Sequence, residues 1–347
     1  MVVSTGLKLV FVLLLASLNG CTTLEWYGQA LRGQLNLMAQ REDIETLITN
    51  QDTPVELREK LELVLEIRAF AAEELGLPDN DSYTEWVDLD RDAVVWNVIA
   101  APEFSLVAHT WCYPLVGCLA YRGWFDQDRA QREADELSAA GLDTRVVPVT
   151  AYSTLGRLDD PVTSVMLRWD DAALAGLIFH ELAHQQVFVA GETLFNEGYA
   201  TSVERAGVRR WLAQRGDGEA LAQWQRRLNA RQAFVELLLT ARRRLDEVYR
   251  ITLDPSIWGP AKQVGFGQLR QHYRDWSVQQ GIDPYAAYFS RPLNNADLVL
   301  IATYEAGVHA FDALLAEYGN NMHRFHSAVA ELAEASPDRR REFLQLP

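Results

Sequence analysis

Hydrophobic residues in the N-terminal part of the chain recur every three or four positions, which is the spacing of one face of an α-helix. The pattern runs from about Leu24 to Leu77 and is regular at Leu57, Leu61 and Val64. Pro54 suits the first turn of such a helix, where an N–H group has no partner within the helix. The spacing therefore predicts mainly helical structure over this segment.

The pattern changes after Tyr83, where short runs of β-branched and aromatic residues alternate with Pro, Gly and Asp, as in strands joined by turns. One helix is predicted within this region, from Asp128 to Ala140, and Gly141 closes it. From Asp170 onward the hydrophobic spacing is helical again. The predicted strands are Ala93–Ile99, Leu115–Tyr121, Arg145–Val149 and Ser164–Leu167.

This order of elements predicts a single α+β domain that is predominantly helical, with a small mixed sheet followed by a helical region. The sheet-rich part covers about residues 83–170 and the helical part about 170–347, within a mature domain of residues 21–347. Because no long linker separates the two parts, we expect them to share one compact fold.

Acidic residues outnumber basic ones along the chain. Its 347 residues include 48 Asp and Glu against 32 Lys and Arg, which gives a formal net charge of −16. Such a charge repels the phosphate backbone of nucleic acids and offers no basic face to anionic lipids. We therefore predict no nucleic-acid partner, and the charge identifies no protein partner.

The first twenty residues have the layout of a secretory signal peptide, with a weakly basic start and then an apolar run from Leu7 to Ala16. This run is too short to span a bilayer comfortably, and small and polar residues follow it. Leu18–Cys21 resembles the bacterial lipobox, in which the chain is cut before a cysteine that receives lipid. We predict lipidation of Cys21, with plain secretion or a membrane anchor as alternatives. Because Thr22 follows this cysteine rather than Asp, the resemblance favours the periplasmic face of the outer membrane.

Two cysteines remain after lipidation, Cys112 and Cys118. In the oxidising periplasm so close a pair can form a disulfide if the chain turns between them, and Pro114 and Gly117 favour a turn. The alternative is a pair of buried thiols.

A candidate metal site lies in Leu174–Gln186, a segment without proline whose one charged residue is Glu181. The segment is predicted to be a buried helix. His180 and His184 are one turn apart, so both imidazoles leave the same face and can bind one ion. Glu181 lies beside them, where it can accept a proton from water without binding the ion. The alternative, two core histidines and a stray glutamate, would bury three polar groups without partners.

Beyond this helix, the stretch Leu194–Ala200 reads Leu-Phe-Asn-Glu-Gly-Tyr-Ala. It resembles the Leu-Asn-Glu-Gly-Phe-Ala stretch of the gluzincin aminopeptidases, whose Glu is the third zinc ligand. The resemblance implies that Glu197 is the third ligand. It also implies that Glu204, on the same helical face, orients a histidine. For both residues the alternative is an ordinary helical acid, stabilised in the case of Glu197 by the helix dipole.

The chain departs from the large gluzincins in two respects. Only residues 185–196 separate the second histidine from Glu197, so a tight turn must join the two helices, and Gly191 is the candidate for it. The Gly-x-Met-Glu-Asn segment that binds the substrate amine in those enzymes is absent from the sequence. Their exopeptidase anchor therefore cannot be transferred to this chain.

Several stretches along the mature chain match a known family: Trp111–Cys118 with Tyr121–Gly123, Tyr152–Gly156 with Asp159–Pro161, His180–His184, Asn196–Ala200, and Asn294–Ala296 with Tyr304. Through them most of the mature chain resembles a family of bacterial lipoproteins described as zinc aminopeptidases. The resemblance implies a zinc-dependent aminopeptidase. We expect one Zn²⁺ per chain and short peptides outside the cytoplasm as substrates.

Three further residues are candidates for catalysis or substrate binding. Gluzincins use a Tyr or His from a later helix to stabilise the oxyanion, and Tyr304 lies in a regular helical stripe that suits this role. The alternative is a core tyrosine bonded to a backbone carbonyl. Asp159 and Asp160 are candidates to bind a free α-amine. An Asp before Pro more often caps a turn.

We therefore predict a zinc metallopeptidase, most readily an aminopeptidase, that is held at the membrane by its N-terminal lipid and acts on a peptide substrate. Two alternatives remain: an endopeptidase that acts on envelope proteins, and a non-catalytic zinc-binding lipoprotein of the envelope. The side-chain preference and the oligomeric state do not follow from the sequence.

Overall fold

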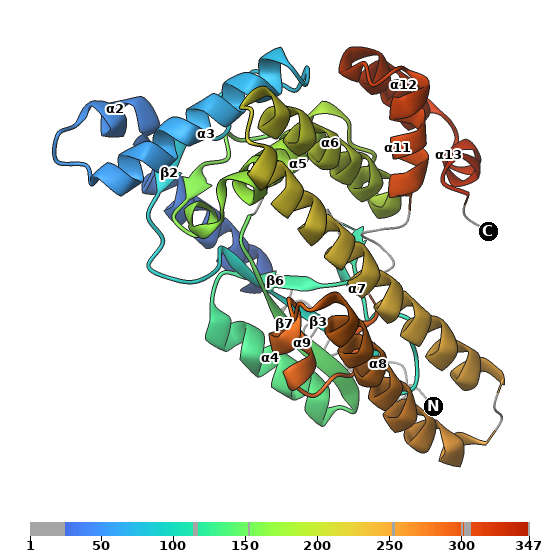
Figure 1. Ribbon diagram of the computed structural model, residues 1–347. Helices are drawn as coiled ribbons and strands as arrows, with labels where there is room; N and C mark the ends of the chain where they lie inside the picture. The colour runs from blue at the N-terminus through green and yellow to red at the C-terminus, as the bar shows by residue number, and fades with distance from the viewer. Residues whose placement is uncertain are drawn as a thin grey trace, which may run out of the picture.

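A computed structural model describes residues 25–113, 117–151, 153–251, 254–299, 301 and 307–345. It confirms the predicted class, an α+β fold that is predominantly helical, with small sheets of two or three strands. Figure 1 shows a group of helices around α5 and α6, and a sheet that lies between α4 and the pair formed by α7 and α8.

The described chain is built mainly from helices, and most of its strands are short. The helices are 25–39, α2 (Ile44–Thr49), α3 (Val55–Glu73), α4 (Gln127–Ala139), α5 (Asp171–Gln186), α6 (Thr193–Gln214), α7 (Gly218–Ile251), α8 (Trp258–Gln280), α9 (Ala286–Ser290), α11 (Val308–Glu317), α12 (Met322–Glu334) and α13 (Pro337–Phe343). The strands are β1 (Glu42–Asp43), β2 (Glu85–Val87), β3 (Val95–Pro102), β4 (Trp111–Tyr113), β5 (Gly117–Leu119), β6 (Arg122–Trp124), β7 (Leu142–Val149) and β8 (Val162–Thr163). Short 3₁₀ turns are η1 (Met166–Arg168), η2 (Pro255–Ile257) and η3 (Asn295–Asp297).

β3 is the central strand of an antiparallel sheet with the order β6-β3-β7. Its side chains alternate between two cores, as the period of a strand requires. Trp96 and Val98 pack with α4, whereas Ile99 and Ala101 pack with α7 and α8. Helices therefore cover both faces of the sheet, and this explains why nearly every residue of β3 is buried.

The largest core lies between α3, α5, α6, α11 and α12. The long helix α7 connects this core to the sheet, as Figure 1 shows. Trp224, near its N-terminus, packs in the largest core, and Leu238 and Leu245 pack on the sheet side. The helix that carries the two histidines, α5, is thus buried in the largest core, which agrees with its apolar sequence.

The predicted strand Ser164–Leu167 is wrong. β8 ends at Thr163, and the 3₁₀ turn η1 begins at Met166. The hydroxyl of Ser164 accepts a hydrogen bond from the N–H of Leu89 and donates one to its carbonyl. The Ser164 hydroxyl thus bonds both backbone groups of Leu89, which would otherwise be available to a longer strand. The chain therefore turns after two paired residues.

The N-terminal helical stretch is interrupted. β1 separates helix 25–39 from α2 and pairs antiparallel with β2. Asp43 then starts α2, because its carboxylate accepts a hydrogen bond from the N–H of Thr46. The hydrophobic spacing on either side of this strand gave no sign of the break.

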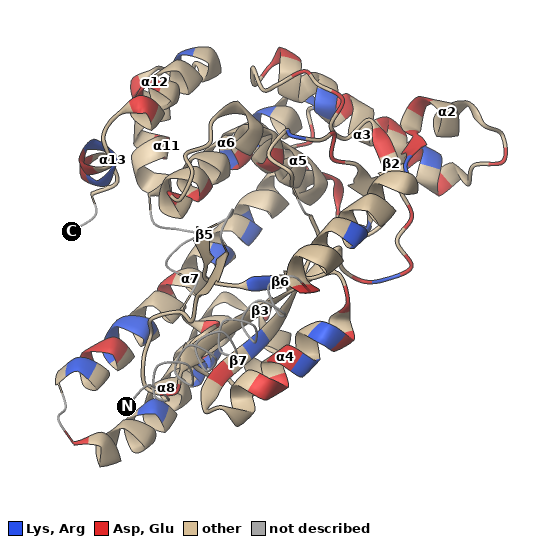
Figure 2. Ribbon diagram, turned by 180° about the vertical axis from the view of Figure 1, so that it is seen from behind, with Lys and Arg blue, Asp and Glu red and all other residues tan. Residues whose placement is uncertain are grey.

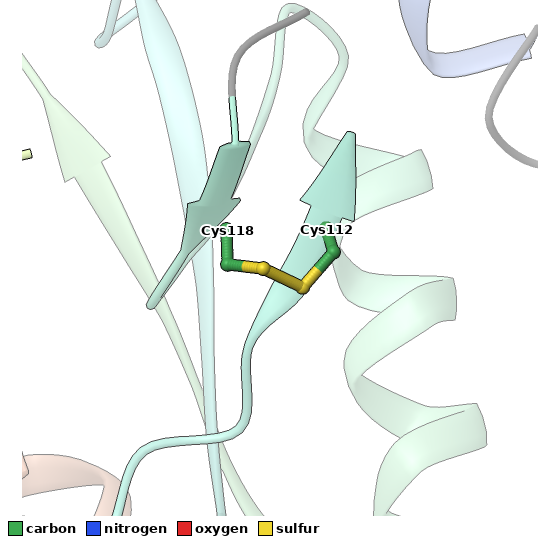
Figure 3. Close-up of a disulfide and its surroundings, with 2 residues drawn as sticks. All are labelled: Cys112 and Cys118. Atoms are coloured by element: carbon green, nitrogen blue, oxygen red, sulfur yellow. A yellow bond between two sulfur atoms is a disulfide. The ribbon is translucent and has the colours of Figure 1, made fainter. Parts of the chain in front are cut away.

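A disulfide joins Cys112 to Cys118 across the antiparallel pair β4–β5 (Figure 3). The two cysteines are directly opposite each other, and their side chains are exposed. Trp111 and Tyr113 point to the opposite face of the hairpin, where they are buried. Gly117 has a φ of +84°, a conformation that glycine adopts without strain.

The predicted signal peptide and Cys21 lie outside the described residues. Across the part of the chain that is described, no helix combines the length and the apolarity needed to cross a membrane. Figure 2 shows Lys and Arg interspersed with Asp and Glu along α4 and α7. These basic residues therefore belong to faces of mixed charge.

Candidate metal centre

Helices α5 and α6 pack against each other, and this pairing brings together residues that are distant in sequence. Gly207 of α6 permits the close approach, because a Cβ there would lie 2.7 Å from the ring of Phe179 on α5. Further along the pair, a Cβ on Gly176 would lie 3.3 Å from Glu204. Glu197 precedes Glu204 by two helical turns, so both carboxylates lie on the face of α6 that meets α5.

The connection between α5 and α6 is short and is held by a side chain. Gly191, with a φ of +80°, supplies the predicted turn. The buried side chain of Asn196 accepts a hydrogen bond of 2.9 Å from the N–H of Val189 and donates one of 2.8 Å to its carbonyl. Asn196 therefore fixes the link against the first turn of α6, which places the adjacent Glu197.

Three candidate ligands converge on one point. Nε2 of His180 lies 3.2 Å from Nε2 of His184 and 3.4 Å from Oε2 of Glu197, and Nε2 of His184 lies 3.6 Å from Oε1 of Glu197. A tetrahedral zinc site with bonds of about 2.0–2.1 Å separates its ligand atoms by about 3.4 Å. The residues present therefore fit a zinc ion, and they form a group that could hold a metal.

The outer nitrogen of His180 has a partner that fixes the ring. Nδ1 lies 3.1 Å from Oε2 of Glu204. Because a carboxylate accepts a hydrogen bond there, Nδ1 keeps its hydrogen, and Nε2 is the nitrogen that can lose its proton and present a lone pair toward Glu197 and His184. Nδ1 of His184 is buried and has no partner within the described chain.

The pKa values show how strongly the site attracts a positive charge. Burial lowers the pKa of His180, but the carboxylates of Glu197 and Glu204 outweigh this effect and raise it to about 10. Burial and the charge on His180 lower the pKa of His184 to about 4. The histidines keep the pKa of Glu197 below its usual value despite its burial. The two carboxylates therefore hold one proton on His180, at the position where a metal cation would bind.

Glu181 lies beside the ligands in a buried environment. Burial, helped by the carboxylates of Glu197 and Asp160, raises its pKa to about 7. The charge on His180 and a hydrogen bond with Ser153 act in the opposite direction. A carboxyl group with this pKa can accept and return a proton near neutral pH.

The two aspartates of the Asp-Asp-Pro segment have different surroundings. Asp160 is 2% exposed, and its carboxylate accepts hydrogen bonds from the hydroxyl of Ser153 and from the N–H and hydroxyl of Thr154. This is the turn-capping arrangement, so its oxygens hold the loop before α5 rather than a substrate amine. Asp159 is exposed.

Tyr304 lies outside the described residues. Tyr199, which directly follows the Glu-Gly pair, is buried, and its hydroxyl lies 2.8 Å from Nδ1 of His326. Nε2 of His326 lies 2.8 Å from the carbonyl oxygen of Leu75 and donates to it. Burial lowers the pKa of His326, which favours the neutral ring. The pair is thus a buried hydrogen-bonded chain in the core.

Sequence reasoning assigned no role to three residues that shape the site: Asn196, Ser153 and Tyr83. Tyr83 is buried with a φ of +63°, its N–H donates to the carbonyl of Asp160, and burial raises its pKa well above the usual value. The second largest cause is the nearby Glu181. Almost one hundred positions separate the two residues, so no local pattern could have linked them.

The fold and the site define an α+β protein with a candidate metal centre of two histidines and one glutamate. A family model described as "Putative aminopeptidase" matches residues 25–344, and the chain belongs to that family. At this level the protein is a peptidase. No curated protein and no solved structure matches the chain.

Proposed function

We propose that the protein is a zinc-dependent peptidase of the gluzincin kind, with one zinc ion held by His180, His184 and Glu197. The convergence of these three ligands, with separations of 3.2, 3.4 and 3.6 Å, carries the proposal. The presence of Glu181 favours a catalytic zinc site over a structural one, because a structural zinc site needs no buried base beside it.

Each residue of the site has a distinct task in peptide hydrolysis. When bound, zinc supplies Lewis-acid polarisation of the scissile carbonyl and of water. Glu181 accepts the proton of the attacking water and returns it to the leaving amine. Glu204 holds His180 in the tautomer that presents Nε2 to the ion. Asn196 holds the start of α6, and with it Glu197.

The family description favours an aminopeptidase, and we propose that short peptides are its substrates. An aminopeptidase needs a group that recognises the free α-amine. The carboxylate of Asp160 already accepts hydrogen bonds within its own turn. Asp159 is therefore the remaining sequence-predicted candidate for binding the α-amine. The observation that Asp160 is engaged keeps an endopeptidase as the second candidate function.

We further propose that the enzyme works outside the cytoplasm, attached through lipid on Cys21 at the periplasmic face of the outer membrane. The signal-peptide layout and the lipobox resemblance support this location. The disulfide between Cys112 and Cys118 is also typical of an oxidising compartment.

The test is peptide hydrolysis by the purified mature chain. Matched peptide libraries with free and N-acetylated amines are compared, using wild type, His184→Ala and His272→Ala. His272 is an exposed histidine on α8 and serves as the control. We expect hydrolysis of the free peptides by wild type and the control, and its loss in His184→Ala. Equal cleavage of acetylated peptides would establish the endopeptidase, and activity in His184→Ala would refute the zinc mechanism.

A further inference from the structure

A cavity of about 400 Å³ lies beside the sheet, bordered by β7, α7, α9 and η3. Four successive residues of β7, Arg145–Pro148, line it. Because neighbouring residues of a strand point to opposite faces, a cavity that touches four in a row lies along the edge of the strand. This agrees with the sheet order, in which β7 pairs with β3 on one side.

The walls of this cavity are mainly apolar. Ile99 and Leu238 come from the core between the sheet and α7, Phe234 and Tyr288 add aromatic rings, and Ile301 closes one side. A space of this size accommodates one large side chain with its backbone groups. The lining therefore suits an apolar residue of a ligand.

One positive charge in the cavity has no matching negative charge among the described residues that line it. Asp297, whose side chain is 1% exposed, accepts bonds of 2.9 and 2.8 Å from Arg145 and lies 2.8 Å from Nη2 of Arg291. Two guanidinium groups thus share one carboxylate. Nη1 of Arg291 is buried and has no hydrogen-bond partner within the described residues. Its guanidinium lies 4.4 Å from the ring centre of Tyr288, which holds it in the cavity wall.

We propose that this cavity binds the C-terminal residue of a short peptide, with its α-carboxylate paired to Arg291 and its apolar side chain against Phe234 and Leu238. A planar guanidinium is the side chain best suited to a carboxylate, and Nη1 of Arg291 is the part of this one that is left without an acceptor. The charge and the apolar walls come from the structure, whereas the choice of a peptide rests on the proposed function.

Two chain segments connect the cavity to the metal centre and limit how far apart they lie. Pro148 lines the cavity, and five residues further on Ser153 hydrogen-bonds with Glu181. Five extended residues span at most about 17 Å. On the other side, Ile301 lines the cavity, and Gly307 contacts Gly198, next to Glu197. Since a strand rises about 3.3 Å per residue, a peptide of about five or six residues reaches from the cavity to the ligands.

The test measures binding without turnover. The Glu181→Gln protein is titrated calorimetrically with an N-acetylated pentapeptide, four alanines followed by phenylalanine, as the free acid and as the C-terminal amide. Each titration is run with zinc and after chelation. We expect the acid to bind about tenfold more tightly than the amide in both states. Because the experiment measures binding, its result does not depend on whether the protein cleaves peptides.

Variants locate the carboxylate. Adding Arg291→Gln should remove the preference for the acid, whereas adding Arg243→Gln, a change to an exposed arginine on α7, should retain it. Val147→Glu places a negative charge at the 36% exposed rim and should also reduce the preference, without removing any bond to Asp297. Equal binding of the acid and the amide would overturn the proposal. So would a preference for the acid that persists in both Arg291→Gln and Val147→Glu, or a preference that chelation of zinc abolishes.

Discussion

Oε2 of Glu204 lies 3.1 Å from Nδ1 of His180, across the contact between α6 and α5. This acid and this imidazole are twenty-four positions apart in sequence. The bond decides which nitrogen of His180 carries the proton, and so which nitrogen is free for a metal. The position of Glu204 thus explains why its helix supplies two acids to one site.

Replacing Glu204 by Ala should weaken zinc binding about 10- to 100-fold, because His180 loses the group that fixes its tautomer and orientation. Glu204→Gln should lose less, since its amide oxygen still accepts from Nδ1. The measurement is competition for zinc with a chelator of known affinity. Equal affinity in wild type and Glu204→Ala would contradict the assigned role.

Replacing Glu181 by Gln should leave zinc content and thermal stability close to wild type and reduce kcat about 100- to 10,000-fold, the usual contribution of a general base. Glu236→Gln, at an exposed position of α7, is the matched control. Steady-state kinetics and metal analysis are run on the same preparations. A fully active Glu181→Gln protein rules out this residue as the base.

Asn196→Ala should destabilise the protein by about 1–3 kcal/mol, because two backbone groups of Val189 lose their partner in a partly buried link. It should also weaken zinc binding, since Glu197 is the next residue. Urea unfolding of the metal-free protein gives the first quantity and chelator competition gives the second. If stability falls while zinc affinity does not change, the link does not position Glu197.

The contribution of His326 to the stability of the metal-free protein should decrease as the pH falls below 6.5, the usual pKa of histidine. Burial lowers the pKa of His326 in the folded state, so the unfolded chain binds the proton more tightly. The neutral ring stabilises the fold fully above pH 6.5, and this contribution is lost as the pH falls toward the lowered value. The difference in unfolding free energy between wild type and His326→Gln should therefore shrink from pH 7.5 to pH 5. A difference that is constant or grows would contradict a neutral buried His326.

The parts of the site that were predictable from sequence are those set by local spacing. His180 and His184 share a helical face because they are four positions apart, and the apolar residues around them predict burial. The role of Glu197 as third ligand was predicted from the resemblance of Leu194–Ala200 to a stretch in the gluzincins. Both the helix and the turn at Gly191 lie where their local residues indicate.

The remaining features depend on contacts between distant segments. Ser164 ends a strand through hydrogen bonds to Leu89, seventy-five positions away. Arg145 and Asp297 are 152 positions apart. A pattern of hydrophobic and polar residues reports burial and period, and it does not report which polar side chains meet in space. The turn at Asp160 was one of two interpretations, and its hydrogen bonds with Thr154 show which one the fold uses.

The central claim is a zinc site made by His180, His184 and Glu197, and its most direct test is elemental analysis of the purified mature chain. We predict about one zinc per chain in wild type and in the exposed-histidine control His272→Ala, and almost none in His184→Ala and Glu197→Ala. Absence of zinc from wild type after incubation with zinc and desalting, or full zinc content in the ligand variants, would contradict it.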